Sequence, residues 1–509
     1  MSWNLVEALE NSAASFPERE AYVYRGASAT YAELIEQVRR CAAGLAAEGI
    51  AKGDKVVLLL GNAPEFIVSL YGALALGAIV VPVNPTYTAD ELAYILADSG
   101  ARAAIAAAPL RPLLAALQAR LPRPIQPFYV GEEEGEDSFA RLLQLGAGHL
   151  ESAYIDEKDT AVILYTSGTT GKPKGAMLSH RNLATNAESV YTMFELTENE
   201  RAVAVLPMFH IYSLTVCLNA PLAVGACIII LPRFHPVETI AAIREQRATM
   251  FSGVPTMYAY LLQVPDATAA DFATLRLCSS GGASLPVEML RKVEERFGVV
   301  IYEGYGLSEA APVTAFNPLG GKRKPGSVGV DIPRVTNRIV DHQGNEVPRG
   351  EIGELIVQGP NVMQGYYKLP DATAEALRGG WLHTGDIARM DEEGYIYIVD
   401  RMKDMINVGG FNVYPREVEE VLYRHPGVFE AAVVGVPDET LGEAVKAYVV
   451  RSDEALTAEE LAAFCSGSLV KYKRPTAIEF LAELPKNSSG KTLRRALKEK
   501  AQQPPSAQA

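Results

Sequence analysis

The sequence has few residues of the kinds that build disulfide frameworks or metal centres. It contains five cysteines and seven histidines among 509 residues, with neither a C-x-x-C nor an H-E-x-x-H pattern. An odd number of widely spaced cysteines indicates reduced thiols in a cytoplasmic protein, and scattered histidines argue against a structural metal. The cysteines are Cys41, Cys217, Cys227, Cys278 and Cys465.

The chain also lacks an excess of positive charge, a secretory leader pattern and a run typical of a membrane span. Its net charge of −14 argues against a nucleic-acid partner, but leaves room for a local basic pocket that binds a small polyanion. Glu7 and Glu10 stand where a signal peptide carries lysine or arginine. The apolar runs 66–83 and 211–232 are interrupted by glycine and change from Leu and Ala to β-branched residues. We therefore predict that each is a buried helix–turn–strand unit.

The same succession of helix, turn and buried strand recurs along the first part of the chain. Residues 237–255 combine an amphipathic helical pattern with a short apolar strand and a glycine-containing turn. Repeated units of this kind are typical of an α/β protein. The sequence therefore predicts layered α/β sheets over most of the first 330 residues.

The pattern changes near residue 325 and again near residue 400. Over 325–400, glycine and proline punctuate alternating valine and isoleucine, which predicts a mainly β subdomain. Helical periodicity returns after Asp400–Lys403, where we place a domain boundary. We thus expect a large N-terminal domain (1–400), a small α+β C-terminal domain (401–500) and a disordered tail (501–509).

One loop combines small, hydroxylated and basic residues in an unusual density. Tyr165–Ala176, YTSGTTGKPKGA, follows a short buried strand predicted at 161–164 and precedes a helix predicted from Met177 onward. Glycines allow backbone N–H groups to approach a ligand, and Lys172 and Lys174 add positive charge, which suits a polyphosphate. The G-x-x-x-x-G-K-[ST] pattern of the common P-loop is absent. The alternative is a flexible surface turn.

This loop resembles the signature loop of the adenylate-forming superfamily, which includes acyl- and aryl-CoA synthetases, firefly-type luciferases and nonribosomal-peptide adenylation domains. Further segments follow in the order of that superfamily, and together they cover residues 20 to 495. The resemblance is strongest to bacterial medium- and long-chain fatty-acid CoA ligases. The segments are LPMFHIY (206–212), SSGGASLP (279–286), YEGYGLSEAAPV (302–313), WLHTGDIA (381–388), DRMKDMINVGGFNVYPREVE (400–419) and LPKNSSGKTLRR (484–495).

The resemblance implies an AMP-forming acid–thiol ligase that uses ATP, Mg²⁺ and coenzyme A. In the first half-reaction a carboxylate attacks the α-phosphate of ATP, which yields an acyl-adenylate and pyrophosphate. In the second half-reaction a thiol displaces AMP. The first step is difficult because one anion must approach a polyanion, so the site must neutralise charge and align the attack.

The resemblance also implies which residues bind the nucleotide. The loop holds the β- and γ-phosphates, Tyr305 lies against the adenine, Ser308 meets the α-phosphate, and Asp386 and Arg401 bind the ribose. Taken alone, the segment around Tyr305 and the aspartate after a glycine are both typical of ordinary turns. The residues so implied are Thr166, Ser167, Gly168, Thr169, Thr170, Gly171, Lys174, Gly282, Ala283, Glu303, Gly304, Tyr305, Gly306, Ser308, Asp386, Arg401 and Lys491.

The reaction centre implied by the resemblance contains Lys491, Glu309 and His210. Glu309 and Thr166 supply oxygens to Mg²⁺, a hard cation. Lys491 reaches across from the small domain and bridges the attacking carboxylate and the α-phosphate, a task that suits a compact, flexible ammonium. His210 borders the carboxylate pocket and gates entry of the thiol. Without the other motifs, the residues around Lys491 favour a surface lysine before a basic helix; for His210 the alternative is a partly buried packing histidine.

The resemblance further implies that the small domain is mobile. It swings about Lys403 between the half-reactions, because Lys491 must leave before the thiol reaches the acyl carbon. Gly409 and Gly410 then line the pantetheine channel, where a side chain would block it. A simple loop is the alternative for this glycine pair.

The acid pocket is predicted to be largely apolar. Amino-acid-activating relatives place an aspartate directly after the aromatic residue of LPMF-type segments, whereas this chain has His210 and Ile211 there, so an α-amine has no partner. An apolar lining fits an alkyl chain or an aryl ring. The lining residues implied are His210, Tyr212, Val216, Val254, Met257, Pro312 and Val313.

These observations favour a medium- or long-chain fatty acid as the substrate and free coenzyme A as the acceptor. An aryl-acid ligase of the coumarate or benzoate type, and transfer to a separate carrier protein, stay open as alternatives. The oligomeric state also stays open, a homodimer included. A nucleotide- or acyl-binding sensor without catalysis is disfavoured because Lys174, Glu309, Asp386, Arg401 and Lys491 are all present.

Overall fold

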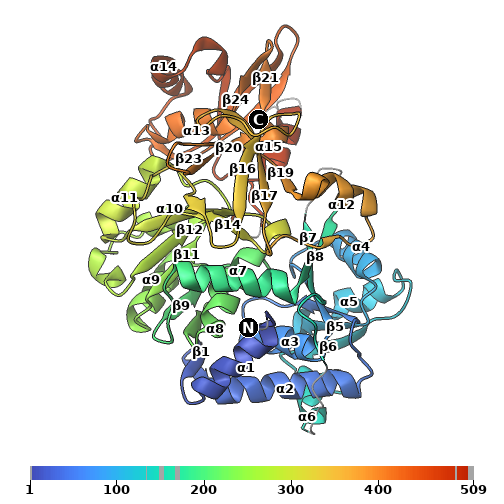
Figure 1. The fold of residues 1–509 in the computed structure, drawn as a ribbon. Helices are drawn as coiled ribbons and strands as arrows, with labels where there is room; N and C mark the ends of the chain where they lie inside the picture. The colour runs from blue at the N-terminus through green and yellow to red at the C-terminus, as the bar shows by residue number, and fades with distance from the viewer. Residues whose placement is uncertain (1–2, 133–134, 148–153, 167–171, 488–489, 503–509) are drawn as a thin grey trace.

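The computed structural model describes residues 3–132, 135–147, 154–166, 172–487 and 490–502. A large lobe contains the N-terminal and central parts of the chain, and a smaller C-terminal lobe sits on it (Figure 1). The mixed α/β architecture with layered sheets confirms the predicted fold class. None of the helices in the described ranges is long and apolar enough to cross a membrane.

The first layer of the large lobe is a seven-stranded sheet. Five of its strands are parallel, and β8 and β18 add an antiparallel edge. In sheet order the strands are β18 (Gly365–Tyr366), β8 (Lys174–Ser179), β7 (Thr160–Thr166), β4 (Ile79–Pro82), β3 (Lys55–Leu59), β5 (Ala103–Ala107) and β6 (Gln126–Val130). The helices of this part are α3 (Pro64–Ala75), α4 (Ala89–Ser99), α5 (Arg111–Gln118) and α6 (Phe139–Leu145).

The second layer is a nine-stranded sheet. In order its strands are β15 (Val330–Asp331), β14 (Val313–Phe316), β13 (Ile301–Gly306), β12 (Leu277–Ser280), β11 (Met250–Gly253), β9 (Arg201–Ala204), β10 (Cys227–Ile230), β1 (Glu20–Tyr24) and β2 (Ala27–Thr30). Its helices are α1 (Leu5–Ser15), α2 (Tyr31–Ala47), α7 (His180–Met193), α8 (Ala220–Ala223), α9 (Pro236–Glu245), α10 (Pro255–Leu262) and α11 (Val287–Phe297), with the π-helix η2 (Ser213–Asn219). Short 3₁₀ turns are Ala108–Leu110, Ala269–Phe272, Ser308–Ala310 (η4), Arg378–Gly380, Met402–Asp404 (η6) and Lys471–Lys473.

Both apolar runs are buried helix–strand units, as predicted. The run 66–83 contains most of α3 followed by β4, and the run 211–232 contains η2, α8 and β10. All five cysteines are free and buried within these layers or the small lobe. The apolar character of the runs therefore reflects burial between elements of the protein.

The helix predicted from Met177 begins later than expected. Met177 and Leu178 belong to β8, which pairs with β7 through partners such as Leu164 and Ala176. The helix α7 begins at His180, where the side chain of Ser179 accepts a hydrogen bond from the backbone N–H of Asn182. A serine in this position ends the strand and caps the helix at once. Pairing with β7 on one side and with β18 on the other decided the state of these residues.

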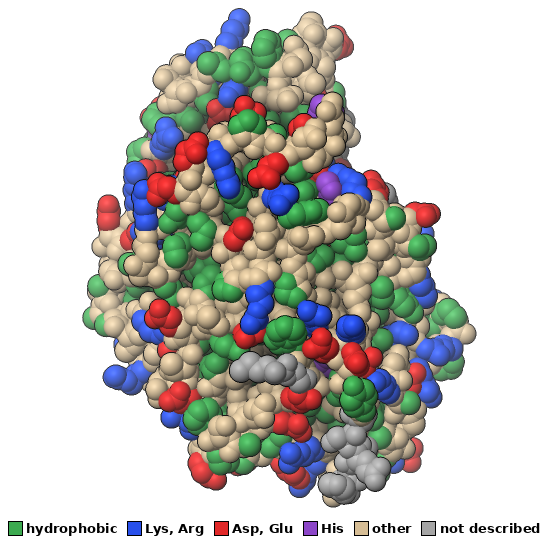
Figure 2. Space-filling model, in the orientation of Figure 1, with side chains coloured by type: hydrophobic (Ala, Val, Ile, Leu, Met, Phe, Trp, Pro, Cys, Tyr) green, Lys and Arg blue, Asp and Glu red, His purple; other side chains and the backbone are tan. Residues whose placement is uncertain are grey.

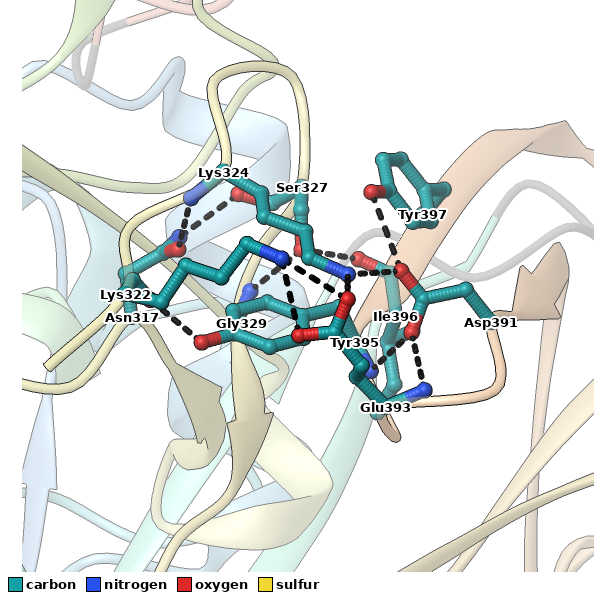
Figure 3. Close-up of polar contacts among 10 residues, drawn as sticks. All are labelled: Asn317, Lys322, Lys324, Ser327, Gly329, Asp391, Glu393, Tyr395, Ile396 and Tyr397. Carbon is teal, nitrogen blue, oxygen red and sulfur yellow. Dashed lines mark hydrogen bonds and ion pairs between the residues drawn. The ribbon is translucent and has the colours of Figure 1, made fainter.

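A four-stranded sheet forms the part of the large lobe next to the small lobe. Its strands are, in order, β16 (Thr336–Val340), β17 (Ile352–Gln358), β19 (Leu382–Met390) and β20 (Ile396–Arg401), with the helix α12 (Pro370–Ala376) before β19. Lys324 bridges Asp391 (2.5 Å) and Glu393 (3.0 Å), and Ser327 donates to the carbonyl of Ile396 (Figure 3). These bonds fasten the β19–β20 turn and the start of β20 to the loop between β14 and β15 of the nine-stranded sheet.

The small lobe contains a five-stranded sheet. The path runs through β22 (Phe411–Val413), β21 (Ile406–Val408), β24 (Gly442–Arg451) and β23 (Val428–Asp438), and β25 (Ala477–Phe480) pairs with β24. The helices are α13 (Pro415–Tyr423), α14 (Ala458–Ser468) and α15 (Arg494–Gln502). The helix α15 includes Ala501 and Gln502, the first two residues of the segment predicted as a tail; residues 503–509 lie outside the described ranges.

Candidate active site

The signature loop joins two antiparallel strands. Thr166 at the end of β7 faces Lys174 at the start of β8, and the Thr166 hydroxyl donates to the Lys174 carbonyl at 3.5 Å. The predicted phosphate-binding residues between them lie outside the described residues; they are Ser167, Gly168, Thr169, Thr170 and Gly171. The described ends of the hairpin thus bring a hydroxyl and an ammonium to the base of this loop.

Glu309 lies beside this hairpin through a residue that the sequence interpretation missed. Glu309 and Ser308 are in η4, and the phenol of Tyr366 donates a hydrogen bond of 2.9 Å to Glu309 Oε1. The Lys174 ammonium lies 5.1 Å from the centroid of the Tyr366 ring. Tyr366 is in β18, which pairs with β8. No local pattern marks Tyr366, because only sheet pairing brings it to Glu309.

The predicted Mg²⁺ ligands, Thr166 and Glu309, supply oxygen atoms of the kind that a hard cation prefers. Among the described residues, no group of three or more His, Cys, Asp or Glu side chains could hold a metal ion by itself. A carboxylate and a hydroxyl fit an ion that takes its remaining ligands from phosphate oxygens and water.

The predicted ribose-binding residues, Asp386 and Arg401, lie next to Tyr305, which was predicted to contact the adenine. Asp386 in β19 and Arg401 in β20 are paired across the four-stranded sheet, with Arg401 Nε 3.6 Å from Asp386 Oδ1. The Tyr305 phenol donates to Asp386 Oδ2 at 2.5 Å. Burial, together with the Asp386 carboxylate, raises the pKa of Tyr305 well above its usual value. Tyr305 therefore stays a neutral donor that orients the carboxylate.

Lys491 extends from the small lobe to this group. Burial and the neighbouring Arg401 lower the pKa of Lys491 to about 7, although Asp386 acts in the opposite direction. Burial, followed by the charge of Lys491, lowers the pKa of His210 to about 4, so this half-buried imidazole is neutral near pH 7. The hydroxyl of Thr256 in α10 donates to the carbonyl of Gly490 at 3.0 Å and holds the lysine segment against the large lobe.

Gly282 and Ala283, two of the predicted nucleotide-binding residues, lie in the loop between β12 and α11. Gly282 has a φ of +77°, a conformation that favours glycine, and both Gly282 and Ala283 are exposed. Glu303 is buried, and its Oε1 accepts a hydrogen bond of 3.1 Å from the backbone N–H of Leu285. Burial raises the pKa of Glu303 to about 7. Its side chain therefore fixes the loop that carries the two small residues.

The two glycines of YEGYG, which were predicted to bind the nucleotide, are also required by the packing of neighbouring strands. A Cβ atom on Gly304 would lie 2.5 Å from Phe316 Cδ2, and one on Gly306 would lie 2.3 Å from the Pro312 carbonyl oxygen. Both distances are too short for any side chain. These glycines allow β13 and β14 to approach, whatever ligand lies nearby.

The predicted acyl pocket surrounds η2. Val216 in η2 is buried, and Thr215 donates to the carbonyl of Ala311, directly before Pro312. Val254, Met257, Pro312 and Val313 are buried as well, and Tyr212 is half-buried. The hydroxyl of Tyr212, one of the predicted lining residues, belongs to a chain of linked hydroxyl groups. The linked hydroxyls are Tyr212 to Ser279 at 3.1 Å and Ser279 to Ser252 at 2.8 Å.

Gly409 and Gly410 form the two-residue turn between β21 and β22. Their φ angles are +57° and +86°, and both residues are exposed. Tight hairpin turns of this kind require positive φ at both central residues, so the turn explains both glycines. Lys403 is exposed in η6, between the last strand of the four-stranded sheet and the first strand of the small lobe.

Acidic and basic side chains are interspersed over the face shown in Figure 2. At the lobe interface, in contrast, Lys491 and Arg401 converge on Asp386. The fold and the site define the class: a two-lobed α/β enzyme whose charged residues from both lobes meet at one interface.

Comparison with known proteins identifies the family. The AMP-binding enzyme model matches residues 9–367, and the AMP-binding enzyme C-terminal domain matches residues 417–491. The chain therefore belongs to the AMP-binding enzyme family. It is 41% identical to a long-chain-fatty-acid–CoA ligase of Bacillus subtilis, over 97% of this chain and 94% of that protein. A feruloyl-CoA synthase of Amycolatopsis is 39% identical, over 94% of this chain and 95% of that protein. The crystal structure of ATP-bound MatB from Rhodopseudomonas palustris matches with a TM-score of 0.91 and 35% identity, over 98% of this chain and 99% of that one.

Proposed function

We propose that the protein is an AMP-forming acid:CoA ligase that activates a medium- or long-chain fatty acid with ATP and transfers the acyl group to coenzyme A. The observation that carries this proposal is the position of Lys491. This lysine of the small lobe lies close enough to Asp386 and Arg401 of the large lobe for their charges to shift its pKa. The charge of Lys491 in turn lowers the pKa of His210. An enzyme that joins two anions needs a cation at that junction.

In the proposed first half-reaction, residues of both lobes bind and orient ATP. Asp386 accepts hydrogen bonds from the ribose hydroxyls, with Tyr305 and Arg401 holding its carboxylate in place. Lys174 and the loop before it bind the terminal phosphates. Glu309 and Thr166 would hold Mg²⁺, which would supply further positive charge at the phosphates. Each charge-assisted hydrogen bond of this kind contributes about 1.5–3 kcal/mol.

Lys491 then bridges the acid and the α-phosphate. Its ammonium donates to a carboxylate oxygen and a phosphate oxygen as negative charge moves from one to the other. The carboxylate oxygen bonds to the α-phosphorus, and pyrophosphate departs. His210 is neutral, so it borders the acid without adding a charge that would hold the carboxylate too tightly. For the second half-reaction, the small lobe turns about Lys403, withdraws Lys491 and presents Gly409 and Gly410 to the pantetheine.

The choice of a fatty acid rests on the apolar residues around η2 and on the similarity to the Bacillus subtilis ligase. One observation favours a second candidate, an aryl acid that carries a hydroxyl group. The linked hydroxyls of Tyr212, Ser279 and Ser252 offer donors and acceptors within the lining. A relative of similar identity is a feruloyl-CoA synthase.

A pyrophosphate-release screen tests the proposal. The protein is incubated with ATP, Mg²⁺ and acids from acetate to palmitate, together with benzoates and hydroxycinnamates, and coenzyme A or a carrier protein bearing a phosphopantetheine arm is then added. We expect AMP and an acyl-CoA thioester with the longer fatty acids. Preference for a hydroxycinnamate would establish the aryl-acid candidate. Thioester formation only on the carrier would show that the carrier, and not coenzyme A, is the acceptor. If no acid yields AMP, the proposed function is wrong.

A further inference from the structure

Asp400 connects the last strand of the large lobe to two helices of the small lobe. It stands near the end of β20, where it pairs with Ile387 of β19, so its backbone belongs to the four-stranded sheet. The residue is 5% exposed. A carboxylate that is almost fully removed from water needs partners for both of its oxygens.

Two of those partners come from the small lobe. Asp400 Oδ2 accepts a hydrogen bond of 2.9 Å from the backbone N–H of Arg416, in the first turn of α13. Asp400 Oδ1 lies 3.4 Å from the Arg494 guanidinium, at the start of α15, and also accepts from the backbone N–H of Arg401 at 2.8 Å. A negative charge at a helix N-terminus is favourable in itself. One carboxylate thus joins the starts of two helices.

Arg494 also contacts two carboxylates besides that of Asp400. Its guanidinium makes two hydrogen bonds of 2.8 Å to Glu419 of α13, and it lies 3.6 Å from Asp404 of η6. Arg494 follows Lys491 by three residues, and its charge is among those that lower the pKa of Lys491. The position of Arg494 therefore fixes the end of the segment that carries Lys491.

We infer that Asp400 is a positioning residue for Lys491: it clamps Arg416 and Arg494 so that the small lobe is held in the arrangement that forms the acyl-adenylate. The inference rests on the proposed function and deepens it. Asp400 precedes the proposed pivot at Lys403, whereas Arg416 and Arg494 follow it. Rotation of the small lobe therefore breaks the contacts of Asp400 and removes Lys491 in the same movement.

Separate measurements of the two half-reactions distinguish this positioning role from a general structural role. Asp400→Asn keeps the size of the side chain but removes the charge that Arg494 faces. We expect acid-dependent pyrophosphate release to fall roughly ten-fold or more, as loss of a charge-assisted bond requires. Thioester formation from supplied acyl-adenylate and coenzyme A should be unchanged or faster, because that step needs the other arrangement.

A matched control and a double-mutant cycle complete the test. Asp391→Asn removes a carboxylate of the same sheet that bonds Lys324 within the large lobe, and both half-reactions should stay at the wild-type level. Arg494→Gln should reproduce the selective loss, and the double variant Asp400→Asn with Arg494→Gln should be no worse than the single ones. Arg494→Gln also carries the test if Asp400→Asn lacks a cooperative thermal transition.

Several results would overturn the inference. They are an equal loss of both half-reactions, no loss of pyrophosphate release, and strictly additive effects in the double variant. A wild-type protein that releases no pyrophosphate with any acid would refute the proposed function instead, so the two failures are distinguishable.

Discussion

Tyr366 and Glu309 are joined by a hydrogen bond of 2.9 Å, although 57 residues separate them in the sequence. The ring of Tyr366 also faces the Lys174 ammonium at 5.1 Å. A single aromatic residue thus sets the spacing between the proposed Mg²⁺ ligand and a proposed phosphate-binding lysine. Glu309 can point one oxygen at the phenol and leave the other for the cation.

Removal of the Tyr366 hydroxyl should weaken the use of Mg²⁺ and ATP without unfolding the protein. In Tyr366→Phe, the ring remains but Glu309 loses its donor, so we expect the KM for MgATP to rise roughly two- to ten-fold. Pyrophosphate release over a series of Mg²⁺ concentrations measures this, and calorimetric binding of MgATP gives a readout without turnover. Tyr367→Phe, at the next residue, is the control and should behave as the wild type. An unchanged KM would remove Tyr366 from the site.

Activity should depend on pH through Lys491. Its pKa is lowered to about 7, so in the free enzyme the ammonium is lost as the pH rises through 7. We therefore expect kcat/KM for adenylate formation to fall about ten-fold per pH unit above that value. Bound ATP favours the charged lysine, which should shift the decline in kcat to higher pH. Lys491→Arg keeps its charge throughout, so any residual activity should lack this decline; the same alkaline limb in that variant would contradict the assignment.

Replacement of Lys491 should separate the two half-reactions. Lys491→Ala should slow adenylate formation by a factor on the order of 10²–10³ or more, because it removes a donor to developing charge. Thioester formation from supplied acyl-adenylate should persist. Lys498→Ala, on the adjoining helix, is the control for loss of a lysine. Equal loss of both steps in Lys491→Ala would refute the proposed division of roles.

The position of Val216 predicts an effect on acyl-chain length. Val216 is 1% exposed in η2, so a tryptophan there must occupy space that the acyl chain is proposed to use. We expect Val216→Trp to shift the preference toward shorter acids, and Val216→Leu to do so to a smaller degree. Competition among octanoate, laurate and palmitate measures the shift. Val237→Trp on the surface of α9 should have no effect, and an unchanged profile in Val216→Trp would exclude Val216 from the lining.

Stability should fall in mild acid because of His180. This histidine is 1% exposed, and burial lowers its pKa to about 4, with Asp159 and Lys52 acting in opposite directions. Between pH 6.5 and 4 the unfolded chain binds a proton at His180 that the folded chain does not, so this contribution to stability decreases as the pH falls. The loss by pH 4 is about 3 kcal/mol. Denaturant unfolding of His180→Gln should show a flatter pH dependence than the wild type, whereas the exposed control His342→Gln should match the wild type.

Much of the fold was predictable because its signals are local. The run 66–83 specifies a helix, a turn and a strand through residues that are neighbours in the chain. The strand at Met177 was not predictable in this way, because its hydrogen bonds go to β7 and β18. The helical pattern of the residues after Ser179 continues into Met177 and Leu178, so the sequence predicted one helix over all of them. Only the capping bonds at Ser179 mark the change.

The candidate site was likewise predictable only in part. The order and spacing of the motifs predicted which side chains carry the proposed chemistry, since hydroxyls, lysines and carboxylates at those positions suit a polyphosphate whatever surrounds them. Only the tertiary structure decided how they are held. Tyr366 reaches Glu309 through sheet pairing, Asp400 reaches Arg494 across the two lobes, and Tyr212 joins Ser279 and Ser252 from separate elements. Hydrogen bonds act over about 3 Å between atoms, regardless of distance along the chain, so these partners were set when the sheets and lobes packed together.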